Sequence, residues 1–465
     1  GARSSLRRVV TRGNVTMRLR SLSLAGSLGV LWLRFGPHQP GCAVIPRAPQ
    51  SAPWGSGLRS RATGSASFRG LTALDASLKD FSLDAQRVAL GSMPVVLVVG
   101  NEAADADSII SALLYAYLLQ EVSVCPGEAP IAMAKCFRSD MMLRAETKLL
   151  LGLCGVDVES LIFVDDACWH TLRRRAVKLV LTDHNAADGL LTDMGDKVSE
   201  ILDHHSDLGK HPQVKGQSRC IAFEGGVATA ASTCTVVCER FLAHDQGRDI
   251  LKRDGGAAAK ALLGVILLDS VNLDPSAKKA CPRDFAAVAE LRRLLPSAEA
   301  DGDGLFDVLN NAKFDAKFWS DLGASACLRY DFKRFTVGTR SCSLSSVLCP
   351  PDALVAKAGW AAAAATYANE STIYGVMSLT RSEDGRLERH LALTSKEPGL
   401  ALEAANFLAS YEKGMIGLEP AEPAGSAALE DRPDMLVFKQ RNVGVGRKQV
   451  APALLQFLGS LDQPT

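Results

Sequence analysis

Short apolar runs alternate with longer runs of helical periodicity between residues 76 and 295. The run Met93–Gly100 is short and rich in β-branched residues, which predicts a buried strand. The apolar residues of the following segment, Asp107–Val122, have the spacing of a helix that packs against a sheet. Further strands are predicted at Ser160–Asp166, Val177–His184 and Val198–His205, and helices over residues 226–243 and 256–270. This alternation predicts an α/β fold with a mostly parallel sheet flanked by helices.

The pattern changes at "LLPSAEADGDG", where proline, glycine and acidic residues interrupt the apolar periodicity. Beyond it we predict an alanine-rich helix, a pair of strands, a last strand, a glycine loop and a terminal helix. These lie at Leu354–Ala368, 374–382, 386–395, Asp434–Gln440 and 441–462. The predicted organisation is therefore a leader (1–75), a first domain (76–295), a linker (296–304) and a smaller α/β domain (305–465).

Composition narrows the class of protein. The chain has 465 residues and a formal net charge of +1, so its overall charge predicts no nucleic-acid partner. Its 12 cysteines contain no CxxC pair and are more typical of a reducing compartment than of a disulfide framework. The sequence contains no uninterrupted apolar run long enough for a membrane span. It does not indicate an oligomeric state.

The leader differs from the rest of the chain. Residues 1–74 contain eleven arginines but no aspartate, glutamate or lysine, which is typical of an organellar transit peptide. Within it, Met17–Arg34 has a basic start and a short apolar centre, which also suits a secretory signal. Cytoplasm is the default localisation, and mitochondrion and plastid are the alternatives that this leader raises.

Acidic residues follow the apolar runs of the first domain. Because parallel strands bring their carboxyl ends to one crevice, we expect these side chains to share a site. Taken alone, each has another explanation: Asp107 would cap the following helix, and His204 would be an ordinary surface or core histidine. Recurrence in several runs favours the shared site. The residues concerned are Asp105, Asp107, Asp183, Asp203, His204, His205 and Asp269.

So many carboxylates would raise one another's pKa unless cations neutralised them. Aspartate together with imidazole suits Mg²⁺ or Mn²⁺ better than a structural zinc ion. The number of ligands is sufficient for two divalent metal ions, which can activate a water and stabilise a leaving phosphate oxygen. The pattern thus predicts a metal-dependent hydrolase of phosphoanhydrides.

The order Asn101-x-x-x-Asp105-x-Asp107, "LTDHN", "LDHH" and "GVILLDSVNLD" resembles the DHH phosphoesterase superfamily. Within it the chain is similar to the branch of exopolyphosphatases, prune-type proteins and family II inorganic pyrophosphatases, over residues 80–462. The segments 312–335 and 443–458 resemble the DHH-associated C-terminal domain of that branch. The resemblance implies an active site in the cleft between the two domains.

The resemblance also implies roles for single residues. Asp183 would bridge two ions and take part in catalysis, His205 would act on the substrate phosphate, and Asp203 would orient the imidazoles. Asn101 would be a metal or substrate contact; family II pyrophosphatases have a histidine there, which argues against a dedicated pyrophosphatase. The implied metal ligands are Asp105, Asp107, Asp183, His204 and Asp269. The implied substrate-binding residues are Lys279, Arg447 and Lys448.

Our leading functional hypothesis is an exopolyphosphatase that releases terminal orthophosphate from inorganic polyphosphate, through a water activated by two ions. The alternatives with the same site are an inorganic pyrophosphatase and a prune-type short-chain polyphosphatase or nucleotide phosphodiesterase. A non-enzymatic alternative is a catalytically weak interaction protein. A single-strand nuclease is disfavoured by the "GRKQ" loop and the neutral charge.

Overall fold

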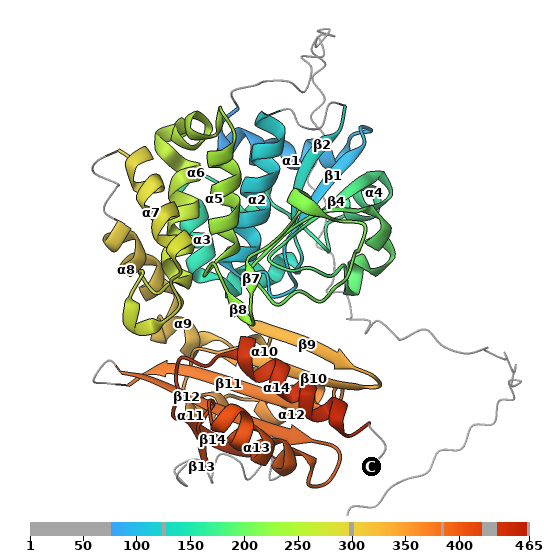
Figure 1. Ribbon diagram of the computed structural model, residues 1–465, viewed down its shortest axis with the longest axis vertical. Helices are drawn as coiled ribbons and strands as arrows, with labels where there is room; N and C mark the ends of the chain where they lie inside the picture. Colours follow the sequence, from blue (N-terminus) through green and yellow to red (C-terminus); the bar gives the residue numbers. More distant parts are fainter. Residues whose placement is uncertain (1–75, 123–126, 297–301, 383–385, 421–434, 463–465) are drawn as a thin grey trace, which may run out of the picture. The chain divides into compact units, whose positions relative to one another are not determined.

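The structure is a computed structural model that describes residues 76–122, 127–296, 302–382, 386–420 and 435–462. The predicted leader lies outside the described residues. The described chain contains two six-stranded sheets, each covered by helices on both faces (Figure 1). Within these residues, none of the helices combines the length and apolarity that crossing a bilayer requires.

The first sheet has the order β3-β2-β1-β4-β5-β6, and all of its strands are parallel. The chain enters at the centre of the sheet, builds one half and then returns to build the other, so the order reverses between β1 and β4. Carboxyl ends of strands beside such a reversal form the usual binding crevice of open α/β sheets. The strands are β1 (Val95–Val99), β2 (Ala129–Ala134), β3 (Ile162–Phe163), β4 (Ala176–Thr182), β5 (Val198–Asp203) and β6 (Arg219–Ile221).

Strand β1 is apolar throughout because helices cover both of its faces. Val96 and Val98 belong to the core beneath α2, α5 and α6, whereas Leu97 belongs to the core on the α4 face. Figure 1 shows these two layers of helices on opposite sides of the sheet. The helices are α1 (Leu78–Leu90), α2 (Ala106–Glu121), α3 (Ala145–Leu153), α4 (Trp169–Arg175), α5 (Thr233–Ala243), α6 (Gly247–Asp269), α7 (Pro282–Leu294) and α8 (Gly302–Lys313).

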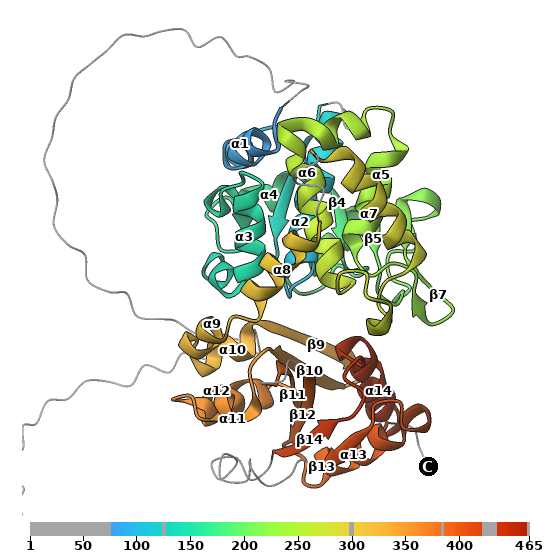
Figure 2. The same cartoon turned by 90° about the vertical axis from the view of Figure 1, so that its left-hand side faces the viewer.

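The second sheet is mixed, with the order β13-β14-β12-β11-β10-β9, in which only the β10–β11 pair is parallel. One face packs on α10 and α12 and the other on α13 and α14, as Figure 2 shows. Its strands are β9 (Asp331–Val337), β10 (Arg340–Val347), β11 (Ile373–Arg381), β12 (Leu387–Ser395), β13 (Leu418–Pro420) and β14 (Leu436–Gln440). Its helices are α9 (Ala316–Asp321), α10 (Ala324–Arg329), α11 (Pro351–Val355), α12 (Trp360–Ala368), α13 (Leu400–Ser410) and α14 (Arg447–Ser460).

The predicted fold class is confirmed. The structure also confirms the predicted strands that correspond to β1, β4, β5, β11, β12 and β14, and the predicted helices that correspond to α2 and α14. The helix predicted over residues 226–243 is wrong in its first part. Val227–Ala228 is instead strand β8, which pairs with β7 (Phe223–Glu224) in a short hairpin through Gly225 and Gly226, and α5 begins only at Thr233. Both glycines have positive φ, which a turn tolerates and a helix does not.

The helix predicted over residues 256–270 is confirmed: it forms the second part of α6, which ends at Asp269. Two other boundaries differ from the sequence interpretation. The alanine-rich segment is split into α11 and α12 at Gly359, whose φ is 77°. Helix α8 begins at Gly302, inside the predicted linker, and its Leu309 lies in the core of the first domain. The packing of α8 against α3 and α6 therefore places it with the first domain.

Gly100, which ends β1, makes the close approach of α2 possible. A Cβ at this position would lie 2.5 Å from the backbone oxygen of Ser108. We expect Gly100→Ala to lower the free energy of unfolding by about 1–3 kcal/mol, because backbone must move to accept it. Urea unfolding followed by far-UV circular dichroism measures the change.

The matched control is Gly152→Ala in α3, where an added Cβ meets no atom within 4 Å. Alanine is the better helix former by about 1 kcal/mol, so this variant should be neutral or slightly more stable. Equal unfolding midpoints for the two alanine variants would show that the close contact at Gly100 does not constrain the fold.

Candidate metal-binding site

Asp183 lies at the carboxyl end of β4, in a left-handed conformation with φ of 62°. Its carboxylate is buried and accepts hydrogen bonds from Asn101 Nδ2 (2.6 Å) and Ser108 Oγ (2.7 Å), both on its Oδ2. Its backbone N–H donates to Leu202 O of the neighbouring strand at 2.9 Å. These contacts fix the carboxylate at the reversal of strand order.

Asp107, in the first turn of α2, is held by the start of another helix. Its carboxylate accepts hydrogen bonds from Ser232 Oγ (2.6 Å) and from the backbone N–H groups of Thr233 (2.7 Å) and Cys234 (2.8 Å). Free N–H groups and the dipole of a helix N-terminus both favour a carboxylate. The serine before the apolar run of α5 is a recognisable N-cap signal in the sequence, although its role in holding Asp107 is not.

His204 follows β5 and turns one ring nitrogen toward these carboxylates. Its Nδ1 donates to the backbone oxygen of Ala230 (3.1 Å). The other nitrogen, Nε2, then lies 3.4 Å from Asp183 Oδ1 and 3.7 Å from Asp107 Oδ2. A histidine whose second nitrogen donates to a backbone carbonyl is oriented as metal-ligating histidines usually are.

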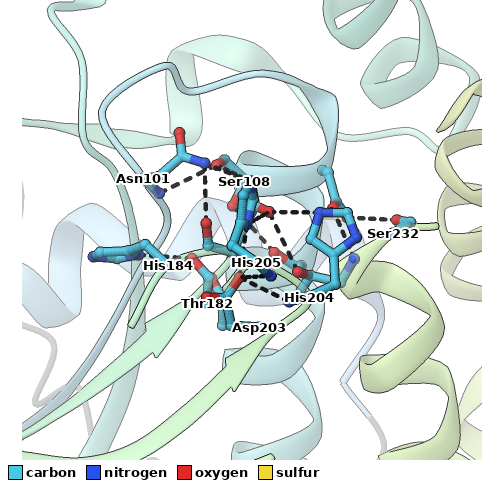
Figure 3. A network of polar contacts seen from close by, with 12 residues as sticks. Asn101, Ser108, Thr182, His184, Asp203, His204, His205 and Ser232 are labelled. Carbon is cyan, nitrogen blue, oxygen red and sulfur yellow. Dashed lines mark hydrogen bonds and ion pairs between the residues drawn. The ribbon is translucent and has the colours of Figure 1, made fainter. Parts of the chain in front are cut away.

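Asp203, the last residue of β5, contacts the two following histidines. Its Oδ1 accepts hydrogen bonds from the backbone N–H of His204 (2.7 Å) and from Nδ1 of His205 (2.8 Å), and its Oδ2 accepts one from Asn185 (2.6 Å). Burial opposes its ionisation, but the charge and hydrogen bond of His205 lower the pKa of Asp203 to about 2. Figure 3 shows both imidazoles beside Asp203, with the His184 ring on the side away from Ser232.

Asp105 and Asp269 complete the predicted acidic set. Asp105 is the N-cap of α2, because its Oδ1 accepts from Ser108 N at 3.0 Å; the cap is therefore not Asp107. Asp269 has a buried Oδ2 with no hydrogen-bond partner. The structure brings both residues close enough to Asp107 for their charges to act on its carboxyl group. All five predicted ligands thus lie in one region.

The electrostatics of this region reflect its excess of negative charge. Burial, followed by the charges of Asp183 and Asp269, raises the pKa of Asp107 to about 8. Burial and then Asp105 raise the pKa of Asp269 to about 6. Burial alone would also raise the pKa of Asp183, but His204, His205 and a lysine, Lys333, hold it well below its usual value.

Cationic side chains of the second domain reach this acidic region. Lys448, in the first turn of α14, donates from Nζ to His204 Nε2 at 2.9 Å. Arg447 instead binds Asp331, donating to its backbone oxygen and to its Oδ1, both at 2.7 Å. Of the predicted pair Arg447 and Lys448, Lys448 therefore directly contacts the site, and Arg447 is anchored beside it.

Lys279 is exposed at the surface. Desolvation by the surrounding protein lowers the pKa of its ammonium group to about 8. The charge of Asp269 opposes this shift, and the charges of Lys313 and Arg389 add to it. Sequence reasoning missed Lys333, whose charge acts on Asp183, and Lys313, whose charge acts on Asp269. No local motif marks either lysine; each is brought to the site by the fold of the second half of the chain.

The donor set fits a divalent metal ion. Ligand atoms of Asp183, His204 and His205 lie within 4.8 Å of one another. The unpartnered buried oxygen of Asp269 is a further atom that a cation would satisfy. Carboxylate oxygens with imidazole are ligands that suit Mg²⁺ and Mn²⁺.

Comparisons with known proteins agree with this geometry. Residues 95–267 match the model of the DHH family, N-terminal domain, and residues 307–457 match that of the DHHA2 domain. Together the two matches span most of the described chain. The protein belongs to the DHH family and carries its DHHA2 domain.

Among its relatives is the exopolyphosphatase PRUNE1 of Bos taurus, 28% identical over 373 residues, which are 79% of this chain and 77% of the other. A probable manganese-dependent inorganic pyrophosphatase of Bacillus licheniformis is 24% identical over 260 residues, 55% of this chain and 71% of that one. A crystal structure from Methanococcus jannaschii, assigned to the family II inorganic pyrophosphatases, has the same fold. Its TM-score is 0.50 and its identity 17%, over 78% of this chain and 98% of that chain.

Metal binding at this site should release protons. With a pKa of about 8, Asp107 is mostly protonated at pH 7. A cation binds the ionised form, so affinity should rise with pH until the carboxyl ionises unaided. Titration calorimetry with Mg²⁺, in buffers of different ionisation enthalpy, should show net proton release at pH 7.

The same titration at pH 9 is the internal control. Asp107 and Asp269 are then already ionised, and proton release should largely disappear while affinity increases. Equal proton release at the two pH values would mean that these carboxylates do not bind the ion.

Proposed function

We propose that this protein is a metal-dependent exopolyphosphatase that removes terminal orthophosphate from inorganic polyphosphate. The observation that carries the proposal is the contact between the two domains at the acidic site, where Lys448 of the DHHA2 domain reaches His204. Carboxylates with imidazole on one side and lysines on the other form a site for a divalent ion and a polyanion together. The name of the PRUNE1 relative supports polyphosphate as the substrate.

Lysines of the second domain would bind the phosphates. Lys448 and Lys333 lie near His204 and Asp183, and among the described residues Lys333 has no carboxylate partner within ion-pair distance. Their positive charges would neutralise the terminal phosphate and the leaving chain. Asp331 holds Arg447 in one orientation and thereby fixes the first turn of α14. The backbone N–H groups at the start of this helix would then be available in a fixed direction for a phosphate group.

His205 would act on the phosphate only after substrate binds. Its Nδ1 donates to Asp203, and burial followed by the charge of Lys448 lowers its pKa to about 4. In the free protein at pH 7 the ring is therefore neutral, with Nε2 as an acceptor. A polyphosphate chain beside it brings negative charge, which raises the pKa of an imidazole and favours the donating form.

Asp105, Asp107, Asp183, His204 and Asp269 would hold the ions. Bound divalent ions would supply the activation of the attacking water and part of the charge neutralisation. The protein's own contribution is to keep the carboxylates fixed. Ser108, Asn101 and the start of α5 do this for Asp183 and Asp107 through the hydrogen bonds described above.

Asn101 favours polyphosphate over pyrophosphate. Its Nδ2 donates to Asp183, and its Oδ1 accepts from Ala103 N at 2.8 Å, so both ends of the amide are engaged within the protein. The corresponding residue of family II pyrophosphatases is a histidine, by the resemblance set out above. An amide used for positioning supplies no nitrogen ligand, which reduces the preference for Mn²⁺ over Mg²⁺.

A panel of substrates tests the proposed function. Orthophosphate release would be measured with Mg²⁺ and with Mn²⁺ on long polyphosphate, tripolyphosphate, pyrophosphate and cyclic AMP. We expect polyphosphate or tripolyphosphate to give the highest kcat/KM. A preference for pyrophosphate would identify a pyrophosphatase, and no hydrolysis of any substrate would refute a phosphoanhydride hydrolase.

Asp183→Ala should lower the rate of phosphate release by about a hundredfold or more, because even substitutions of the groups behind metal ligands cost about 10–100-fold. The control is Asp193→Ala, which removes a carboxylate that pairs with Arg173 at the protein surface. That variant should retain wild-type turnover. If Asp183→Ala matched it, the central role of Asp183 would be refuted.

A further inference from the structure

The loop between β1 and α2 is strained at one residue. We call Asn101–Asp105 the first acidic loop. Ala104, which immediately precedes the predicted ligand Asp105, has φ of 45° and no exposed surface. A left-handed conformation costs an L-residue with a Cβ about 1–2 kcal/mol. The surrounding structure must therefore hold this peptide in place.

Arg144, at the start of α3, holds the loop from outside. Its Nε donates to Ala104 O at 3.0 Å and its Nη2 donates to Ala103 O. The side chain is 3% exposed, and both alanines are buried. Without this guanidinium the two carbonyl groups would lose their donor where no water reaches them, a state that folded proteins avoid.

The guanidinium also contacts the second domain. Arg144 Cζ lies 4.7 Å from the centre of the Tyr330 ring, and the Tyr330 hydroxyl donates to Glu146 Oε1 at 3.2 Å. Tyr330 is buried and directly precedes Asp331, the residue that binds Arg447. One side chain thus connects the first acidic loop with the strand that anchors the phosphate-binding pair.

We propose that Arg144 is a positioning residue: it sets the peptide between Ala104 and Asp105, and its stacking on Tyr330 links that peptide to the second domain. Metal binding at the acidic loop and phosphate binding at α14 are then coupled through this contact. The coupling to phosphate binding rests on the proposed function. The effect of Arg144 on metal binding does not depend on that function.

The chemistry of the contact requires arginine. A planar guanidinium group can donate to two carbonyl groups and stack on an aromatic ring at the same time. An ammonium group cannot do both. Within the described residues, Arg144 has no carboxylate partner at ion-pair distance, and its charge acts on Asp140 and Asp331 only from farther away. Arg144→Lys therefore preserves the charge and removes the geometry.

Arg175 offers a matched control. It also donates to backbone carbonyls in a partly buried position, those of Met93 (2.9 Å to Nε) and Ala89 (2.7 Å to Nη1), but near the amino end of β1, away from the acidic site. Arg144→Lys and Arg175→Lys should both lower the thermal midpoint. Only Arg144→Lys should weaken Mn²⁺ binding to the free protein, by about tenfold or more, as substitutions behind metal ligands do.

Calorimetry without substrate measures this affinity. Similar thermal shifts with unchanged Mn²⁺ affinity in both variants would overturn the proposal, because Arg144 would then be only a structural residue. If the wild-type protein hydrolysed no phosphoanhydride but Arg144→Lys still weakened Mn²⁺ binding, the proposed function would fail and the positioning role would stand.

Tyr330 provides a second test, from the other side of the contact. Tyr330→Phe keeps the stacked ring and should keep KM for tripolyphosphate near the wild-type value. Tyr330→Leu should raise KM and weaken Mn²⁺ binding, and its combination with Arg144→Lys should show less than additive losses, as contacting residues do. Additive losses would overturn the proposed link between the domains.

Discussion

The burial of several carboxylates at one edge of a parallel sheet is the constraint on which this structure depends. Different hydrogen-bond donors stabilise each carboxylate: the N-terminus of α5 for Asp107, Asn101 and Ser108 for Asp183, and His205 for Asp203. Asp269 keeps a buried oxygen without a partner. Because local hydrogen bonds do not neutralise the whole set, the remaining charge has to be met by cations from elsewhere.

Those cations explain why the second domain is part of the site. Lys448 and Lys333 bring positive charge to the carboxylates, although the whole chain carries a net charge of only +1. The charge is therefore segregated, with acids at the ends of the first sheet and lysines on the second domain. A divalent cation beside the acids and a polyanion beside the lysines would each be attracted by the charge it meets there.

The acidic site could largely be predicted from the sequence, because parallel strands bring their carboxyl ends together whatever the intervening residues are. Asp183 and His204 were found in this way. Asp269 ends the helix predicted over residues 256–270, so its place in the set rests on the recurrence of acids after apolar runs and not on strand geometry. Lys333 and Arg144 could not be predicted, because their partners lie far away in the sequence and neither belongs to a periodic pattern or a motif.

Asn101 joins the two strained residues of the site. Its backbone oxygen accepts from Ala104 N (3.2 Å), and its Nδ2 donates to the backbone oxygen of Asp183 (3.1 Å) as well as to its side chain. Ala104 and Asp183, with φ of 45° and 62°, are thus both hydrogen-bonded to Asn101, the first through its backbone oxygen and the second through its side chain. Strain of this kind persists only where neighbouring contacts over-determine it. A histidine at position 101 would keep the backbone contact to Ala104 but not the side-chain amide, which donates to Asp183 and accepts from Ala103 N.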